Sequence, residues 1–137
     1  MRIRPATLDD TDAVLDLWRV GAGESHIPND PEGVRRLLER DPEALLLAHD
    51  DDGRLVGSVI AGFDGWRAHV YRMAVHPDAR KLGVGRALVD AMEERFRRLG
   101  AKRSDAIVYL SNDLGRRFWA ACGYEPDPTT DRWTKWL

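Results

Sequence analysis

The chain has 137 residues, of which 43% are apolar and 32% charged. This length suits one domain with its own core, and the composition excludes a disordered tail, a fibrous repeat and a membrane bundle. The chain has 21 Lys and Arg and 23 Asp and Glu, so its net charge is −2. That value argues against a dedicated duplex DNA binder, for which a strong basic excess is typical.

Metal, disulfide and membrane features are not expected. Cys122 is the one cysteine of the sequence, so neither an intrachain disulfide nor a Cys-based zinc site can form. The four histidines do not fall at the spacing of metal ligands on a helix. No run reaches the roughly 18 apolar residues that a membrane span needs, and no secretory signal is apparent. We therefore expect residues 1–137 to form a single cytoplasmic domain without a bound metal, nucleic acid or membrane.

Two amphipathic helices are predicted in the first third of the chain, after a short strand around Ile3. Apolar residues recur at helical intervals over about 8–20. A second helix is expected to begin after Asp30, which can cap it, with Pro31 in its first turn. This helix should end before Pro42, because a proline disfavours helical geometry in the residue that precedes it.

Three strands are predicted next. Apolar runs at 44–48 and 55–61 are joined by an Asp/Gly turn, which is typical of a hairpin. After a second turn, the segment 69–75 adds a third strand to this meander.

The second half of the chain is expected to begin with a long helix over 83–99. A strand over 106–110, a helix over 113–121 and a final pair of strands, from Tyr124 onward and over 132–137, should follow it. The predicted order is β-α-α-β-β-β-α-β-α-β-β, a mixed sheet with helices on its faces and thus an α/β or α+β fold.

The loop between strand 69–75 and the long helix carries the most specific signal. A helix start presents free N–H groups and a partial positive charge, and glycines let a bulky anion approach the backbone. Arg80, Lys81 and Arg86 add positive charge. Together these features predict a cradle for a phosphate or pyrophosphate.

Two well-known phosphate loops do not match it. A Walker A loop needs Lys and then Ser or Thr after the last glycine, but Arg86 and Ala87 follow Gly85. A dinucleotide fingerprint needs a third glycine, where Leu88 stands. A helix start whose glycines only permit a tight turn is the alternative.

The loop resembles the signature Arg/Gln-x-x-Gly-x-Gly/Ala of the GNAT superfamily of acyl-CoA-dependent N-acyltransferases. Arg80, Gly83 and Gly85 match it, and residues 73–77 resemble the strand and His-Pro step before it. The predicted element order is also that of the family. A downstream Asn-x-x-Ala-x-x-Phe-Tyr-x-x-x-Gly-Phe/Tyr pattern is matched in spacing by Asn112, Gly115, Phe118, Trp119, Gly123 and Tyr124. Two further stretches resemble small bacterial members, the YpeA-like proteins.

The resemblance implies a binding mode for acetyl-CoA. The pantetheine arm would pair with the backbone of Met73 and Val75, where this strand splays from strand 106–110. The Met73 amide would also act as an oxyanion donor near the thioester carbonyl. Asn112 would contact the pantetheine or, alternatively, only cap a helix. The pyrophosphate would lie on the backbone amides of Leu82, Gly83, Val84, Gly85 and Arg86, with Arg80 and Lys81 close by.

The implied reaction is transfer of an acetyl group to a primary amine of a small molecule, peptide or protein by direct attack on the thioester. An alkylamine has a pKa of about 10.4, so the reaction needs a general base or a water wire. His69 shares the strand and, by parity, the face of Met73 and Val75, at a position where some members carry a catalytic Glu. A histidine hydrogen-bonded at a strand start is the alternative.

Other residues are expected around the same cleft. Tyr71 shares the face of His69, and Glu24, Asp64 and Trp66 lie in loops that should flank the acceptor. Alternating residues over 133–136 predict an outer strand or the edge of a homodimer.

Trp119 departs from the family pattern. Many members have there the Tyr that serves as the candidate acid for the departing thiolate, and an indole N–H supplies no proton at neutral pH. Tyr71, Tyr109 or water would have to replace it, and Trp119 could instead pack beside the pantetheine. A CoA-binding sensor or structural protein without turnover, and a nucleotide-binding module, are the alternative functions.

Overall fold

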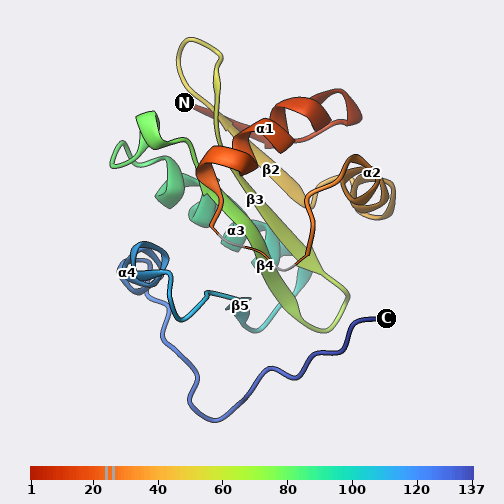
Figure 1. Ribbon diagram of the computed structural model, residues 1–137, viewed down its shortest axis with the longest axis vertical. Helices are drawn as coiled ribbons and strands as arrows, with labels where there is room; N and C mark the ends of the chain where they lie inside the picture. The colour runs from red at the N-terminus through yellow and green to blue at the C-terminus, as the bar shows by residue number, and fades with distance from the viewer. Residues whose placement is uncertain (24, 26) are drawn as a thin grey trace.

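A five-stranded sheet forms the centre of the protein and carries helices on both faces (Figure 1). The computed structural model describes residues 1–23, 25 and 27–137. The strands are β1 (Arg2–Pro5), β2 (Leu45–His49), β3 (Leu55–Phe63), β4 (Ala68–Val75) and β5 (Ser104–Ala106). The helices are α1 (Thr11–Gly21), α2 (Pro31–Arg40), α3 (Val84–Leu99) and α4 (Asp113–Ala121), with 3-10 turns at Leu8–Asp10 and Pro77–Ala79. The predicted mixed α/β fold is confirmed.

The strands lie in the sheet in chain order, from β1 to β5. Each of the first four is antiparallel to its neighbours among them, whereas β5 runs parallel to β4. A parallel pair needs a crossover connection, and α3 supplies it. The strand β4 thus has an antiparallel neighbour on one edge and a parallel neighbour on the other.

Two apolar layers hold the helices on the sheet. The first lies under α1 and α2, and its buried residues include Val14, Leu17, Trp18, Val34, Leu38, Leu45, Leu47 and Ala74. The second lies under α3, and its buried residues include Val59, Ala61, Val70, Val84, Leu88, Met92, Phe96 and Trp119. Burial of these side chains is the main favourable contribution to the stability of the fold.

Polar side chains accept backbone N–H groups at the start of α2, where Asp30 was expected to cap the helix, and in the turn before α1. The Asp30 carboxylate accepts the N–H of Gly33 at 2.5 Å at the start of α2. The Asp10 carboxylate accepts the N–H of Thr7 at 2.8 Å, which closes the turn before α1. The predicted helix over about 8–20 is therefore a 3-10 turn that continues into α1 and ends at Gly21.

The strand predicted over 106–110 is shorter and begins earlier. Its ladder with β4 has three pairs and ends where Val70 faces Ala106. Residues 107–110 form no strand because β4 and this segment diverge beyond that pair.

The prediction of a final pair of strands is also wrong. Residues 124–137 contain no strand, and from Glu125 to the end every residue is exposed. The three-residue β5 offers only a short edge to pair with, and Pro126 and Pro128 cannot donate a ladder hydrogen bond. This C-terminal segment, residues 125–137, instead turns at residues 128–129 and runs past β5 toward the β3–β4 turn (Figure 1).

Gly57 sets how closely α3 approaches the sheet. A Cβ atom at Gly57 would lie 2.7 Å from Val84 Cγ1 and 2.9 Å from Leu88 Cδ1, whereas one at Gly62 on the same strand would have its nearest neighbours at 3.6 Å. We expect Gly57→Ala to lower the free energy of unfolding by about 1–3 kcal/mol, because it overpacks this contact. Gly62→Ala is the matched control and should change it by less. Urea denaturation measures both, and equal effects would contradict the close packing of α3.

Candidate active site at the bulge of β4

A β-bulge interrupts β4 in the middle of the sheet. The pairing register passes from Tyr71 opposite Ile60 directly to Ala74 opposite Ser58. Arg72 and Met73 therefore share the position opposite Val59, and Arg72 has a φ of +48°. Such a conformation is rare for a residue with a side chain, and strained positions of this kind cluster at functional sites.

The bulge corrects the predicted side-chain alternation along β4. Because the bulge adds one residue, odd-numbered side chains face one side of the sheet before it and the other side after it. His69 and Tyr71 lie opposite Gly62 and Ile60 on the α1–α2 side, whereas Met73 packs against the α3 layer. His69 thus shares a face with Tyr71, as expected, but not with Met73 and Val75. A bulge breaks the two-residue period on which the parity argument rested.

A buried chain of hydrogen bonds holds the bulge in place. The indole N–H of Trp18 donates to Ser58 Oγ at 2.9 Å, and the Ser58 hydroxyl donates to the Arg72 carbonyl at 3.2 Å. The Arg72 side chain donates through Nη2 to the Ile27 carbonyl at 2.7 Å and lies 5.5 Å from the centre of the Trp18 ring. Contacts from α1, from β3 and from the segment before α2 therefore fix one strained residue.

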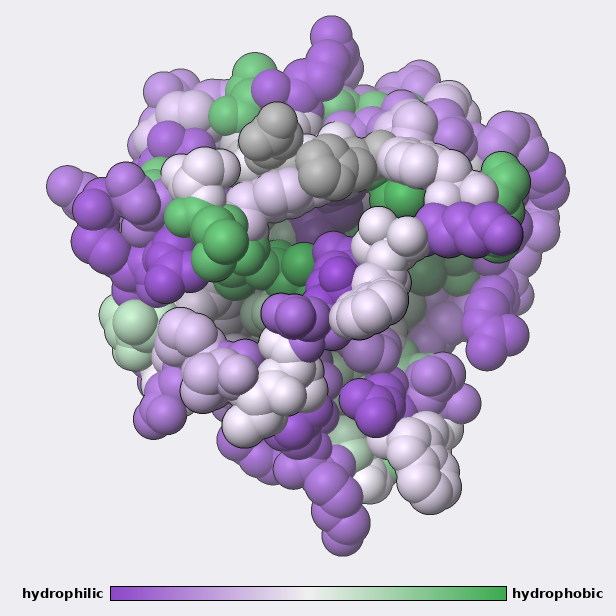
Figure 2. Space-filling view, turned by 60° about the horizontal axis from the view of Figure 1, so that its bottom comes forward, coloured by the Kyte–Doolittle hydropathy of each residue, from purple (hydrophilic) through white to green (hydrophobic). Residues whose placement is uncertain are grey.

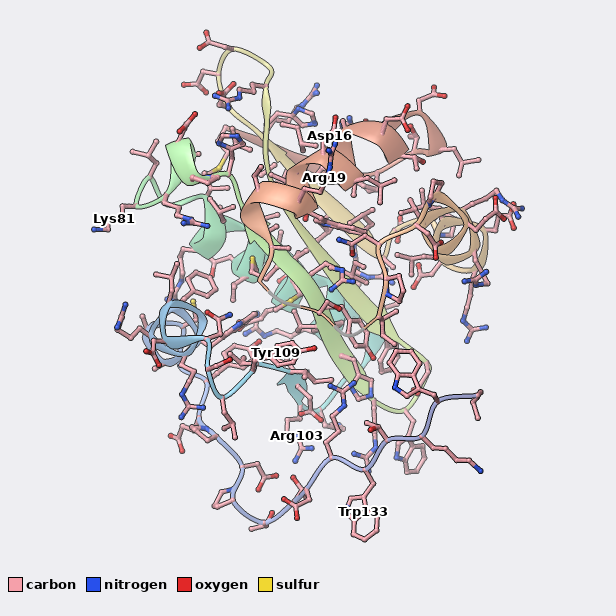
Figure 3. The ribbon with its side chains drawn as sticks, in the orientation of Figure 1. Asp16, Arg19, Lys81, Arg103, Tyr109 and Trp133 are labelled. Atoms are coloured by element: carbon pink, nitrogen blue, oxygen red, sulfur yellow. The ribbon has the colours of Figure 1, made fainter. Side chains whose placement is uncertain are left out.

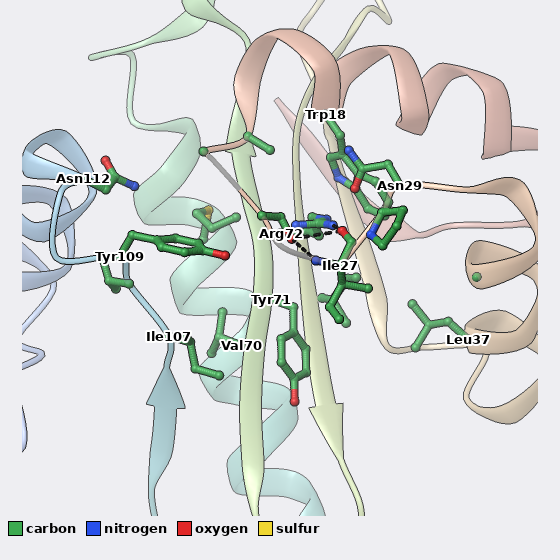
Figure 4. Close-up of a pocket in the computed structure, with 18 of the residues that line it drawn as sticks. Trp18, Ile27, Asn29, Leu37, Val70, Tyr71, Arg72, Ile107, Tyr109 and Asn112 are labelled. Carbon is green, nitrogen blue, oxygen red and sulfur yellow. Dashed lines mark hydrogen bonds between the residues drawn. The ribbon is translucent and has the colours of Figure 1, made fainter. Parts of the chain in front are cut away.

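A cleft of about 490 Å³ opens where β4 and the chain after β5 diverge (Figure 4). Residues 70–73 form one wall, and residues 107–109 with Asn112 form another. Residues of the α1–α2 connection, of α2 and of the C-terminal segment complete it. In the space-filling view, hydrophobic residues lie in a hollow that is bordered by hydrophilic residues and residues of intermediate hydropathy (Figure 2).

The end of α1 reaches the same edge of β4. Ala22 forms a single antiparallel bridge with Ala74. Because β3 already pairs with Ala74 through Ser58, Ala22 lies on the edge that β5 leaves. Asn112 is close by: a Cβ atom at Gly23 would lie 3.1 Å from its Nδ2.

Two tyrosines reach the cleft from opposite walls. Tyr71 extends from β4, and Tyr109 extends from the segment after β5 toward β4 (Figure 4). Burial raises the pKa of Tyr71, the positive charge of Arg132 opposes this, and Asp64 adds to it. His69 stacks on Tyr71 with ring centres 6.1 Å apart, but it does not line the cleft itself.

The glycine-containing loop leads directly into α3. Lys81 and Gly83 have φ values of +64° and +83°, and Gly83 caps the helix. The side chains of Arg80, Lys81 and Leu82 are exposed, and Lys81 extends outward at the loop (Figure 3). A glycine is needed at position 85 for a different reason. A Cβ atom there would lie 2.7 Å from Phe118 Cε1, so Gly85 allows α3 to approach α4.

Asn112 and Trp119 both have structural roles beside the cleft. The Asn112 side chain accepts the N–H of Gly115 at 2.9 Å and caps α4. Trp119 is 8% exposed and packs edge-on against Phe118 and Tyr124, with one side at the cleft. The Tyr124 hydroxyl, bonded to Ser104 and Glu93, has a pKa raised to about 12, above all by burial.

The residues expected to flank the acceptor lie farther out. Asp64 accepts the N–H groups of Trp66 and Arg67, each at 2.8 Å, within the β3–β4 turn, and these bonds lower its pKa. Trp66 is 85% exposed, and neither it nor Asp64 lines the cleft. Glu24 lies outside the described residues.

The charged residues Arg72, Arg132 and Lys135 of the cleft were not predicted. The sequence shows no signal for the bulge at Arg72, because its cause is a distant serine and tryptophan. Arg132 and Lys135 line the cleft from a segment that was predicted to be a strand. Within the described residues, no helix is long and apolar enough to cross a membrane, and no group of His, Cys, Asp and Glu is arranged to hold a metal ion.

Comparison with known proteins defines the class to which this fold and site belong. The model of the acetyltransferase (GNAT) family matches residues 11–124, and the chain belongs to this family. Its relatives include an acetyltransferase of Pectobacterium atrosepticum, 37% identical over 91% of this chain and 88% of the relative. An acetyltransferase of Yersinia pestis is 34% identical over 94% and 91%. The protein is thus an acetyltransferase of the small bacterial type that the sequence motifs indicated.

Solved structures agree on the fold. Ard1 from Thermoplasma volcanium has a TM-score of 0.77 at 23% identity, over 89% of this chain and 80% of that one. Rv2747 from Mycobacterium tuberculosis, solved in complex with CoA and NLQ, has a TM-score of 0.73 at 22% identity, over 95% and 76%.

The hydrogen bonds behind the bulge can be tested as a pair. Ser58→Ala leaves the Trp18 N–H and the Arg72 carbonyl without this partner and should lower the free energy of unfolding by about 1–3 kcal/mol. Trp18→Phe removes the same indole bond. Because both changes remove this hydrogen bond, the double variant should lose less free energy of unfolding than the two single variants lose in sum. Strict additivity in urea denaturation would mean that Ser58 does not link Trp18 to the bulge.

Proposed function

We propose that the protein transfers the acetyl group of acetyl-CoA to a primary amine by direct attack on the thioester. One observation carries the proposal: the edge of β4 that β5 leaves faces a cleft, and the same strand leads into the glycine-containing start of α3. A chain of this family thus offers an extended edge for the arm of the cofactor and a helix start for its phosphates. The experiment is to measure thiol release from acetyl-CoA with and without amines.

The start of α3 fits the pyrophosphate of CoA. The first turn of a helix presents N–H groups that no carbonyl of the helix can accept, and its partial charge favours an anion. Open space lies over Gly83, and Arg80 and Lys81 extend into solvent beside it. In the proposal the amides of residues 82–86 hold the pyrophosphate, and the exposed cations stay close to it.

The bulge fits the pantetheine and the thioester. Met73 and Val75 follow the strained Arg72 on the strand whose neighbour has diverged. We assign their backbone groups to the pantetheine and the Met73 N–H to the carbonyl oxygen of the acetyl group. Ala22 forms a β-bridge with Ala74, the residue between Met73 and Val75. Residues 21–23 therefore either lie beside the cofactor on this edge or move away when it binds. Asn112 stands beside the same edge.

Acetyl-CoA supplies the activated acetyl group, and the residues of the chain move the protons. The incoming ammonium must lose one proton before its nitrogen can attack. We assign that proton to His69, reached through water past the stacked Tyr71 ring. Tyr71 keeps its own proton at neutral pH, because burial raises its pKa, and it can orient the amine by a hydrogen bond.

The departing thiolate needs a proton as the C–S bond breaks. Trp119 is packed in the core and its indole is not an acid. Tyr109 extends into the cleft from the opposite wall, toward the bulge (Figure 4). We therefore assign to the Tyr109 hydroxyl the task that a tyrosine at the Trp119 position performs in many relatives.

Gly83 tests the anion cradle, with Gly53 as its control. Both have a φ of +83° and open space over Cα, but Gly53 lies in the β2–β3 turn. Gly83→Val should weaken acetyl-CoA binding in calorimetry about 5- to 150-fold, the equivalent of losing about 1–3 kcal/mol of hydrogen bonding to the backbone. Gly53→Val imposes similar backbone strain and should leave the affinity unchanged. An unchanged affinity in Gly83→Val would refute the cradle.

His69→Ala and Tyr109→Phe test the proton path. Each should lower kcat at neutral pH by about 10²- to 10⁴-fold, the usual contribution of general acid–base catalysis, while acetyl-CoA affinity stays constant. Tyr124→Phe is the control for removal of a tyrosine hydroxyl away from the cleft. A pH–rate profile of His69→Ala with the shape of the wild-type profile would remove His69 as the base.

A further inference from the structure

The acceptor end of the cleft is positively charged among the residues that the structure describes. This acceptor end consists of Asp30, Tyr71, Arg72, Arg132 and Lys135, which all line the cleft. Three of these side chains are cations at neutral pH and only one is a carboxylate.

The single carboxylate has a structural role. One oxygen of Asp30 accepts the N–H of Gly33 at 2.5 Å, which commits it to the start of α2. In the described part of the chain, no carboxylate forms an ion pair with Arg72, Arg132 or Lys135. Among the described residues, the positive charge of the acceptor end is therefore not neutralised by an ion pair.

Arg72 presents its charge in a fixed orientation. One nitrogen donates to the Ile27 carbonyl, and the guanidinium lies over the Trp18 ring. Burial lowers the pKa of Arg72, with Tyr109 opposing this, but a guanidinium remains charged in a protein. A planar guanidinium held in this way suits a carboxylate, which can accept two parallel hydrogen bonds.

Apolar side chains also line the cleft. Leu37 on α2, Ile60 on β3 and Trp136 of the C-terminal segment border the same cleft. A ligand that fits here combines an anionic group with an apolar body.

We infer that the acceptor is an amine that also carries a carboxylate and an apolar side chain, as a free amino acid such as leucine does. This inference rests on the proposed acetyl transfer and names its substrate class. The amino nitrogen forms a bond to the acetyl carbon, the C–S bond breaks, one ammonium proton passes to His69, and the thiolate takes the Tyr109 proton. The carboxylate lies against the cations of the acceptor end, which repel a polyamine.

Matched amines test the inference. L-Leucine, L-leucinamide, isoamylamine and spermidine are compared by thiol release at saturating acetyl-CoA. We expect kcat/KM for leucine to exceed that for leucinamide about 10- to 150-fold, the equivalent of one charge-assisted hydrogen bond. The amine of leucinamide is less basic than that of leucine, so a larger neutral fraction cannot explain this preference.

Variants test whether the assigned cations cause the preference for leucine over leucinamide. Arg132→Gln combined with Lys135→Gln should reduce the leucine-over-leucinamide ratio about tenfold or more, with unchanged acetyl-CoA affinity. Arg98→Gln changes an exposed cation on α3, away from the cleft, and should leave the ratio as it is.

The outcomes separate the two proposals. Turnover of isoamylamine or spermidine at least equal to that of leucine overturns the inference, although acetyl transfer to amines stands. A preference for leucine that survives the double substitution overturns the assigned cations. Release of no thiol with any amine overturns the proposed function and the inference with it.

Discussion

One extra residue in β4 determines how the rest of the site is arranged. The bulge at Arg72 and Met73 places His69 and Tyr71, before it, on the α1–α2 face and Met73 and Val75, after it, on the α3 face. In the proposed mechanism, the residues of β4 that handle the amine lie before the bulge, and the cofactor lies along the strand after it. A regular strand would have placed His69, Tyr71 and Met73 on one face.

The strain of the bulge must be balanced by the packing around it. A residue such as Arg72 with a positive φ costs about 1–3 kcal/mol. Ser58 donates a hydrogen bond to its carbonyl, and Trp18 holds Ser58 and offers a ring surface to its side chain; both residues are buried. The tryptophan that packs α1 on the sheet therefore also shapes the strand on which the cofactor is proposed to lie.

Local chemistry made much of the fold predictable. Asp30 and Pro31 start α2, glycines with positive φ end α3 and shape its start, and apolar stripes mark the buried faces. The anion loop was predicted because its residues are contiguous. The bulge was not, because it depends on Ser58 and Trp18, which are distant in sequence from Arg72. The C-terminal segment was mistaken for strands because alternating residues do not reveal whether an edge is available to pair with.

The most direct test of the account follows individual backbone amides during a titration with acetyl-CoA. In ¹⁵N-labelled protein, we expect the largest NMR shift changes at Met73 and Val75, at residues 82–86, and at Ala22, which shares the edge of β4. ATP at the same concentration should not reproduce the changes along β4. Shifts confined to the start of α3, or equal responses to ATP, would contradict the proposal that the bulged strand holds the cofactor.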